Sequence, residues 1–254
     1  MVRLGQNFLA DPNLLDAIVR DAELEPADVA LEVGGGEGVL TERIAERVAQ
    51  VHVVEIDEEL ADGLEDLAER TGNVSVVCGD AMRLDLAALD PAPTTMPSNL
   101  PYSIATPVLL RTIAELPSLA TWTVMVQREI ADRLRAAPGT SAYGAPSVLA
   151  QLACEVELIR KVNRAVFRPR PRVDSALVRL RRTGPAPSAE VKRVVRDAFA
   201  HRRKPLASSL ELAGGPSRAD ARAALERIGL AQDVRAERLA PAEFTALTDE
   251  LGAA

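Results

Sequence analysis

Ser98-Asn99-Leu100-Pro101-Tyr102 is the segment whose residue types most directly suggest chemistry. The Asn99 side-chain oxygen and the Leu100 backbone carbonyl can each accept a hydrogen bond from an amine attached to an aromatic base. Such an amine is a poor nucleophile because its lone pair is delocalised into the ring, and two acceptors favour a tetrahedral nitrogen whose lone pair points outward. Pro101 stiffens the turn, and Tyr102 offers a ring face on which a flipped base can stack. The segment therefore suits methylation of a base amine, although Asn and Pro also mark ordinary turns at strand ends.

A glycine-rich segment earlier in the chain is typical of a turn that binds a nucleoside. The apolar run Val29–Val33 predicts a buried parallel strand, and the amphipathic stretch Val39–Val48 predicts a helix. Gly34, Gly36 and Gly38 lie between them, where glycine lets the backbone approach a ligand closely. Their Gly-x-Gly-x-Gly spacing differs from the Gly-x-Gly-x-x-Gly of dinucleotide folds, which favours a nucleoside without a pyrophosphate, such as S-adenosylmethionine.

Two acidic residues lie at the ends of the next predicted strands. Glu55 lies near the end of the apolar strand 51–56, 21 residues after Gly34, where it is placed to hold two ribose hydroxyls. Asp80 follows the strand 74–78, at the edge of an open α/β sheet where ligands bind, and could accept a hydrogen bond from an adenine amine. Asp80 could equally be a capping or turn residue.

With these residues placed, the chain resembles the ribosomal RNA adenine dimethyltransferases over nearly its whole length. The resemblance rests on the motifs Gly5–Leu9, Glu32–Gly38, Glu55–Asp57, Gly79–Ala81, Asn99–Tyr102 and Phe167–Ala176. It implies that S-adenosylmethionine is the cofactor, contacted or bordered by Asn7, Leu9, Gly34, Gly36, Glu55, Asp80, Ala81 and Asn99. It also implies a catalytic group made of Asn99, Leu100, Pro101, Tyr102 and Phe167, in which the Phe167 ring packs against the target base. No general base is needed, because the nitrogen becomes acidic once methylated and can lose its proton to water.

The family has two branches that must be separated. One dimethylates two adjacent adenines near the 3′ end of small-subunit (16S) RNA, and its loss confers kasugamycin resistance. The other dimethylates one large-subunit adenine and confers macrolide resistance. Leu100 and the segments 143–148, 174–178 and 199–204 resemble the first branch, so we expect the small-subunit enzyme, acting in ribosome biogenesis.

Two further classes of protein stay open. One is a non-catalytic RNA-binding assembly factor, against which the intact 99–102 segment argues. The other is a DNA adenine methyltransferase, which usually has Pro where this chain has Leu100.

The charge distribution supports an RNA partner, although the whole chain is acidic with a net charge of −7. Residues 1–100 carry 6 basic and 21 acidic side chains, whereas residues 160–204 carry 15 basic and 3 acidic ones. A concentrated basic stretch is expected of nucleic-acid binding; a codon bias toward Arg would explain its abundance but not its clustering. We therefore expect the small ribosomal subunit, with its 16S rRNA, as the partner. The predicted RNA contacts are Arg168, Arg170, Arg172, Arg202, Arg203 and Lys204.

The order of predicted elements indicates an α/β fold. Helical patterns alternate with short apolar strands as far as Val126, which is typical of a parallel sheet with helices on both faces. The strands 155–162 and 176–181 have no full helix between them and predict an antiparallel hairpin at the sheet edge. We expect a Rossmann-like class I methyltransferase domain over residues 1–182 and a small all-α domain over residues 188–254. Pro97 is awkward within a central strand, so the strand before Asn99 is expected to end early.

Composition limits the remaining possibilities. No apolar run approaches the roughly 20 residues that a membrane span needs, and no signal peptide precedes the first motif. We therefore expect a cytoplasmic protein that does not bind membranes, and we expect it to be a monomer. Cys78 and Cys154 are predicted to be buried free thiols. His52 is expected to face outward on its strand and His201 to lie in the basic stretch, so they form no credible metal site with the cysteines and no metal is predicted.

Overall fold

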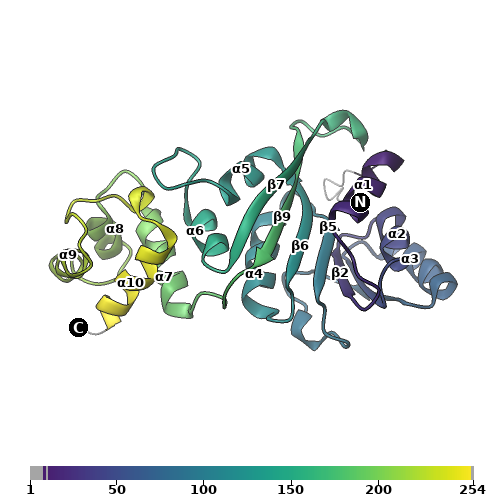
Figure 1. The fold of residues 1–254 in the computed structure, drawn as a ribbon, viewed down its shortest axis with the longest axis horizontal. Helices are drawn as coiled ribbons and strands as arrows, with labels where there is room; N and C mark the ends of the chain where they lie inside the picture. Colours follow the sequence, from purple (N-terminus) through teal and green to yellow (C-terminus); the bar gives the residue numbers. More distant parts are fainter. Residues whose placement is uncertain (1–7, 10, 253–254) are drawn as a thin grey trace. The chain divides into compact units, whose positions relative to one another are not determined.

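The computed structural model describes residues 8–9 and 11–252, which form two compact units (Figure 1). The sheet unit comprises Met1–Ala131 and Glu155–Arg182, and the helical unit comprises Asp132–Cys154 and Thr183–Ala254. Each unit has its own apolar core. The predicted combination of an α/β part with a smaller helical part is therefore confirmed.

A seven-stranded sheet forms the centre of the sheet unit (Figure 1). From one edge to the other its strands are β4 (Val74–Cys78), β3 (Gln50–Glu55), β2 (Val29–Val33), β5 (Thr95–Asn99), β6 (Thr121–Gln127), β9 (Ser175–Arg182) and β7 (Cys154–Val162). The strands from β4 to β6 run parallel, and β9 runs antiparallel to β6. Because parallel strands end on the same side of a sheet, the residues that follow β2, β3, β4 and β5 meet there. The predicted Rossmann-like sheet with an antiparallel edge is confirmed.

The helices of the described chain as far as residue 134 are α1 (Pro12–Asp21), α2 (Val39–Ala45), α3 (Glu58–Thr71), α4 (Ala105–Glu115) and α5 (Arg128–Leu134), with a 3-10 turn, η1, at Leu86–Ala88. Local sequence sets the ends of α3. Asp57 caps its first turn by accepting from the Glu59 N–H at 3.1 Å, and Gly72 ends it with φ +74°. The apolar sides of α1, α2 and α3 share one core with β3.

The helical unit contains α6 (Ala145–Gln151), α7 (Ala189–Ala200), α8 (Leu206–Leu212), α9 (Arg218–Arg227), the 3-10 turn η3 (Ala236–Arg238) and α10 (Pro241–Gly252). The predicted domain boundary assigned residues 132–154 to the first domain, but this segment packs with the C-terminal helices. Tyr143 is fully buried among them, and its hydroxyl donates to the Leu239 carbonyl oxygen at 2.8 Å. Its ring also meets Phe199 edge to face, with the centroids 6.1 Å apart. The boundary between the two units is set by apolar packing, which cannot be read from the order of residues along the chain.

A separate two-stranded antiparallel sheet joins β1 (Phe8–Leu9) to β8 (Phe167–Arg168), which follows the 3-10 turn η2 (Arg164–Val166). Leu9 pairs with Phe167, and Phe8 pairs with Arg168. Phe8 and Leu9 therefore lie against the beginning of the late Phe167–Ala176 motif, although the two segments are far apart in the sequence.

Strand β5 continues through Pro97, so the expectation that it ends early is wrong. Pro97 has no N–H to donate, and the parallel pairing of β5 with β2 is reduced to a single bridge near its start. The Ser98 hydroxyl compensates, because it accepts from the Val33 N–H at 3.0 Å and donates to the Leu31 carbonyl oxygen at 3.4 Å. A side chain thus replaces sheet hydrogen bonds, and β5 reaches the Asn99–Tyr102 turn in register.

One cysteine and one histidine differ from the prediction in their burial. Cys154 is buried and free as predicted, whereas Cys78 is exposed, because it ends the edge strand β4. His52 is buried inside the sheet, with a ring nitrogen 2.8 Å from the Pro91 carbonyl oxygen, so it does not face outward. Among the described residues, no group of three or more His, Cys, Asp or Glu side chains could hold a metal ion. None of the helices in that part of the chain is long and apolar enough to cross a membrane.

Candidate active site

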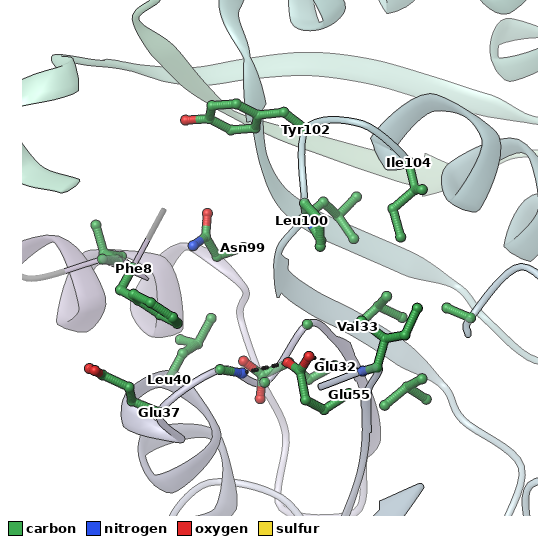
Figure 2. A pocket seen from close by; sticks show the side chains of 18 of the residues that line it. Phe8, Glu32, Val33, Glu37, Leu40, Glu55, Asn99, Leu100, Tyr102 and Ile104 are labelled. Atoms are coloured by element: carbon green, nitrogen blue, oxygen red, sulfur yellow. Dashed lines mark hydrogen bonds between the residues drawn. The ribbon is translucent and has the colours of Figure 1, made fainter. Parts of the chain in front are cut away.

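A cavity of about 220 Å³ lies where β2, β3, β4 and β5 end (Figure 2). The predicted site residues that line it are Leu9, Gly34, Gly36, Glu55, Asp80, Ala81, Asn99, Leu100, Pro101 and Tyr102. They come from separate parts of the chain, which the parallel strands bring to one side of the sheet. The predicted Asn7 lies outside the described residues, and Phe167 contacts Tyr102 without lining the cavity.

The turn after β2 lies very close to the turn after β5. Gly34 has φ +84°, and a Cβ at this position would lie 3.0 Å from Pro101 Cδ. Any other residue at 34 would be strained and would push the Asn99–Tyr102 turn away. The Gly36 N–H donates to Glu55 Oε2 at 2.9 Å, which joins the same glycine turn to the end of β3.

Glu55 is almost completely buried at the cavity wall and is fixed by backbone N–H groups. In addition to the bond from Gly36, the Ile56 and Asp57 N–H groups donate to Glu55 Oε1 at 2.9 and 3.0 Å. Oε2 keeps a second lone pair with which to accept from a ligand hydroxyl. Ile56 is 48% exposed and lines the cavity beside Glu55, where it offers an apolar surface. Sequence reasoning missed Ile56, although its position directly after the acidic residue was a usable signal.

Glu32, on β2, is a second buried carboxyl group of the cavity and was not among the predicted cofactor contacts. Its Oε2 accepts from the Thr41 hydroxyl at 2.6 Å. Burial raises the pKa of Glu32 to about 8, and the nearby charge of Glu55 contributes to the increase. Glu32 is therefore mostly protonated at neutral pH, so its carboxyl group can donate a hydrogen bond.

The turn that carries Asp80 is held from two directions. Asp80 Oδ1 accepts from the Met82 N–H at 2.8 Å, so this side chain does stabilise its own turn. Arg111, on α4, donates to the carbonyl oxygens of Ala81 at 2.6 Å and Leu84 at 2.7 Å. Sequence reasoning missed Arg111, because no motif marks a residue that supports the site from a distant helix.

The Asn99–Tyr102 turn is fixed by backbone hydrogen bonds at both ends. The Leu100 N–H donates to the Met125 carbonyl oxygen on β6 at 3.2 Å, and the Ile104 N–H donates to the Pro101 carbonyl oxygen at 3.1 Å. The Leu100 side chain is only 1% exposed and anchors the turn in the core. The turn is therefore a rigid structure at the cavity rim.

Tyr102 links this turn to two other motifs. Its ring meets Phe167 edge to face, with centroids 6.5 Å apart and an interplanar angle of 75°, and Phe167 pairs through its backbone with Leu9. Burial raises the pKa of the Tyr102 hydroxyl, which keeps the phenol neutral. Figure 2 shows Tyr102 and Glu55 on opposite sides of the cavity, with Asn99 between them.

The net charge of the basic stretch 160–204 is larger than the charge available to a partner, because several of its arginines form ion pairs within the protein. Arg160 pairs with Asp21, and Arg179 and Arg181 pair with Glu23 at 3.0 and 2.6 Å. The hydrogen bond from Arg181 and the charge of Arg179 lower the pKa of Glu23. These arginines join β7 and β9 to the residues at the end of α1, and their role here is structural.

The predicted RNA contacts are exposed but belong to both units. Arg168, Arg170 and Arg172 are exposed within and after β8 in the sheet unit. Arg202, Arg203 and Lys204 are exposed after α7 in the helical unit. Arg202 also pairs with Glu237 at 3.2 Å, which fixes its position within that unit.

Together the fold and the cavity define a Rossmann-like methyltransferase. The parallel order β4-β3-β2-β5-β6, closed by the antiparallel β9, places a glycine turn and a buried acidic residue around one cavity at the strand ends. The chain belongs to the ribosomal RNA adenine dimethylase family, whose model matches residues 2–252. The predicted family and the predicted enzyme class are confirmed.

Individual relatives cover almost the whole chain. It is 44% identical over 247 residues to the ribosomal RNA small subunit methyltransferase A of Rubrobacter xylanophilus, covering 96% of this chain and 92% of the relative. Its structure is similar to a dimethyladenosine transferase from Plasmodium falciparum, with 25% identity, a TM-score of 0.80 and coverage of 96% and 98%. It is also similar to the 23S rRNA methyltransferase ErmE, with 30% identity, a TM-score of 0.68 and coverage of 97% and 100%.

Proposed function

We propose that this protein transfers methyl groups from S-adenosylmethionine to the 6-amino groups of two adjacent adenosines near the 3′ end of small-subunit 16S rRNA. The product is N6,N6-dimethyladenosine. One observation carries the proposal: the Asn99–Tyr102 turn shares a single cavity with the glycine turn and Glu55. The 44% identity to a small-subunit methyltransferase supports this choice of RNA over the large subunit.

The cavity residues fit the nucleoside part of the proposed cofactor. Glu55 has an acceptor lone pair for ribose hydroxyls, and Ile56 and Ala81 offer apolar surface to a base. Asp80 lies at the same wall, where it would accept from the adenine amine. Gly34 lets the glycine turn lie against Pro101, since a Cβ at this position would come within 3.0 Å of Pro101 Cδ. When bound, the cofactor supplies an electrophilic methyl group.

The protein residues at the other side of the cavity would hold the target amine. The Asn99 side-chain oxygen and the Leu100 carbonyl oxygen would accept hydrogen bonds from its two N–H groups, which directs the nitrogen lone pair outward toward the cofactor site. Tyr102 provides a ring face for the flipped adenine, and Phe167 supports that ring from the side. The contribution of these residues is positioning and electrostatics, and the methylated nitrogen releases its proton to water.

The two units would divide the work of catalysis and docking. We assign cofactor binding and methyl transfer to residues 1–182, and docking on the small ribosomal subunit to residues 188–254 together with the exposed arginines after β8. Arg168, Arg170 and Arg172 lie close in sequence to Phe167, so phosphate contacts there would place RNA next to Tyr102. The protein would act as a cytoplasmic monomer.

Three alternative functions are less well supported. Similarity to a 23S rRNA methyltransferase favours a large-subunit substrate, but the identity is 30% compared with 44% for the small-subunit relative. A non-catalytic assembly factor would not need the Asn99–Tyr102 turn to be held so rigidly at a ligand cavity. Leu100 in this turn also argues against a DNA substrate.

Mass spectrometry of RNA after incubation with labelled S-adenosylmethionine tests the proposal. Small subunits lacking the two dimethyladenosines and large subunits lacking adenine dimethylation serve as parallel substrates. We expect dimethyladenosine only in 16S rRNA, at two adjacent positions. Label in 23S rRNA alone would support the large-subunit alternative, and no label in either RNA would support the assembly-factor alternative.

A further inference from the structure

We propose that Ser175 is a positioning residue that sets the orientation of the Tyr102 ring for the target base. The inference rests on the proposed function, because it concerns how the base is received. Ser175 belongs to the Phe167–Ala176 motif, in which the proposed mechanism uses only Phe167. We infer the role of Ser175 from the contacts of its side chain.

The Ser175 hydroxyl meets the far end of the Tyr102 side chain. Ser175 Oγ lies 2.5 Å from the Tyr102 hydroxyl oxygen, and Ser175 is fully buried. Ser175 begins β9, where it is paired with Gln127 at the end of β6. The hydrogen bond thus ties the turn after β5 to a strand that lies 73 residues later in the sequence.

Three contacts together leave the Tyr102 ring little rotational freedom. The backbone at its base follows Pro101 in a turn fixed by the Leu100 hydrogen bond to Met125. Phe167 supports one side of the ring, and Ser175 holds the hydroxyl at the tip. A Tyr side chain has only two rotatable bonds before its ring, so restraints at the base, side and tip define the plane on which a base can stack.

An ordinary structural role for Ser175 makes a different prediction. A buried hydroxyl needs a partner, and Tyr102 could merely satisfy Ser175. In that case, losing the bond would lower stability without changing the rate of the methyl-transfer step. If Ser175 positions Tyr102, removing either hydroxyl should lower the methyl-transfer rate equally. The reason is that a small misplacement of a reacting group lowers the rate strongly.

Single-turnover methylation of small subunits at saturating cofactor separates the two roles. We expect Ser175→Ala and Tyr102→Phe each to lower the rate about tenfold, and the double variant to lose no more than either single one. Ser175→Thr retains the hydroxyl and should recover most of the rate. Thr112→Val is the matched control: it removes another buried hydroxyl of the sheet unit, which binds the Trp122 indole N–H at 3.0 Å, and it should leave the rate unchanged.

A spectroscopic measurement tests the contact without any RNA. The chain has 2 tyrosines, so a ¹³C-tyrosine-labelled sample gives two ring environments that Tyr102→Phe assigns. Ser175→Ala should shift the Tyr102 signal and raise the pKa of its hydroxyl further, because the hydrogen bond with Ser175 lowers this pKa. The Tyr143 signal should stay in place.

The outcomes distinguish failure of this inference from failure of the proposed function. An unchanged Tyr102 signal in Ser175→Ala overturns the inference whatever the substrate is. A shifted signal with a rate within twofold of wild type, or single losses that multiply in the double variant, also overturns it. Wild-type protein that methylates no small-subunit RNA refutes the proposed function and with it the positioning role.

Discussion

At the scale of single residues, the site depends on groups that hydrogen bonds within the protein hold in place. Glu55 is held by backbone N–H groups on both oxygens, and the Asn99–Tyr102 turn is bonded at both ends. Pre-positioned groups lose little entropy when a ligand binds, and they avoid reorganisation during the reaction. We therefore expect a substitution at Glu55 to change mainly cofactor affinity, and a substitution at Asn99 to change mainly the rate of methyl transfer.

Replacing Asn99 by Ala should remove most methyl transfer and leave binding nearly intact. In the proposed mechanism the Asn99 oxygen accepts a hydrogen bond from the reacting amine, so its loss should lower the single-turnover rate more than tenfold, a barrier change above about 1.4 kcal/mol. Rapid-quench assays give the rate, and calorimetry and filter binding give the affinities for cofactor and RNA. A variant that keeps more than about a tenth of the wild-type rate would identify Asn99 as a turn residue only.

Replacing Glu55 by Ala should weaken S-adenosylmethionine binding by roughly 1.5–3 kcal/mol, the range for a hydrogen bond to a charged group. Because three backbone N–H groups also lose their acceptor, the same variant should be less stable. Glu55→Gln keeps the shape and one acceptor oxygen, so its affinity for the cofactor should lie between those of wild type and Glu55→Ala. Calorimetry measures the affinities, with exposed Glu58→Ala on α3 as the control. Unchanged affinity in Glu55→Ala would refute the ribose assignment.

Glu32 should make stability depend on pH in a specific direction. Its folded-state pKa is raised from 4.5 to about 8, so between these values the folded state holds a proton that the unfolded state releases. The free energy of unfolding from this group therefore decreases as pH rises through that window, by up to about 1.4 kcal/mol per pH unit. Urea unfolding at pH 5.5, 6.5 and 7.5 measures the slope. Glu32→Gln should lack this pH-dependent contribution. Equal pH slopes of the free energy of unfolding in wild type and Glu32→Gln would contradict the raised pKa of Glu32.

At the scale of elements, β5 shows how a sheet tolerates a proline next to a functional turn. Pro97 removes a donor from the interior of the sheet, and Ser98 supplies both a donor and an acceptor to β2 in its place. The turn that follows depends on β5 staying in register with β6, to which Leu100 is bonded. The Pro97–Ser98 pair therefore acts as one structural unit.

Ser98→Ala should lower the free energy of unfolding by about 1–3 kcal/mol, because two buried backbone groups lose their partner. In Pro97→Ala/Ser98→Ala the restored N–H of residue 97 can serve β2 again, so this double variant should be more stable than Ser98→Ala alone. Chemical unfolding of wild type, Pro97→Ala, Ser98→Ala and the double variant gives the four free energies of this double-mutant cycle. Additive effects at these adjacent residues would show that Ser98 does not compensate for Pro97.

At the scale of the whole molecule, exposed basic residues occur in both units of an otherwise acidic chain. Arginines on β7 and β9 are bound to Asp21 and Glu23, so charge counted along the sequence is not the charge that RNA meets. The remaining exposed groups include Arg202, Arg203 and Lys204 in the helical unit. Their contribution to binding should be visible as a salt dependence.

Reversing Arg202, Arg203 and Lys204 to Glu should weaken binding to small subunits and flatten its dependence on salt, because bound basic side chains release counterions from phosphates. Filter-binding titrations at two salt concentrations measure both quantities. Reversing the exposed Arg20, Arg47 and Arg70 in the sheet unit changes the net charge equally and serves as the control. Equal salt slopes for wild type and the 202–204 variant would refute an RNA contact there, and cofactor affinity should be unchanged throughout.

Much of the fold and site was predictable from local sequence. The apolar runs, the glycine turn and the acidic residues at strand ends predicted the parallel sheet and the side on which its cavity lies. The segments 29–33 and 74–78 form strands with the predicted bounds, and most predicted cavity residues line one cavity. Strand propensity and turn chemistry depend on neighbouring residues, and the helix predicted between two strands indicates that they run parallel.

Only the tertiary structure decided which distant residues meet. The pairing of Leu9 with Phe167, the bond between Tyr102 and Ser175, and the support of the 80–84 turn by Arg111 each depend on strand register or helix placement. Sequence periodicity says which face of an element is apolar, but it does not say which residue of another element lies opposite. The sequence alone therefore determined the family and the chemistry of this protein, whereas packing determined how rigidly its site is held and which of its charges face a partner.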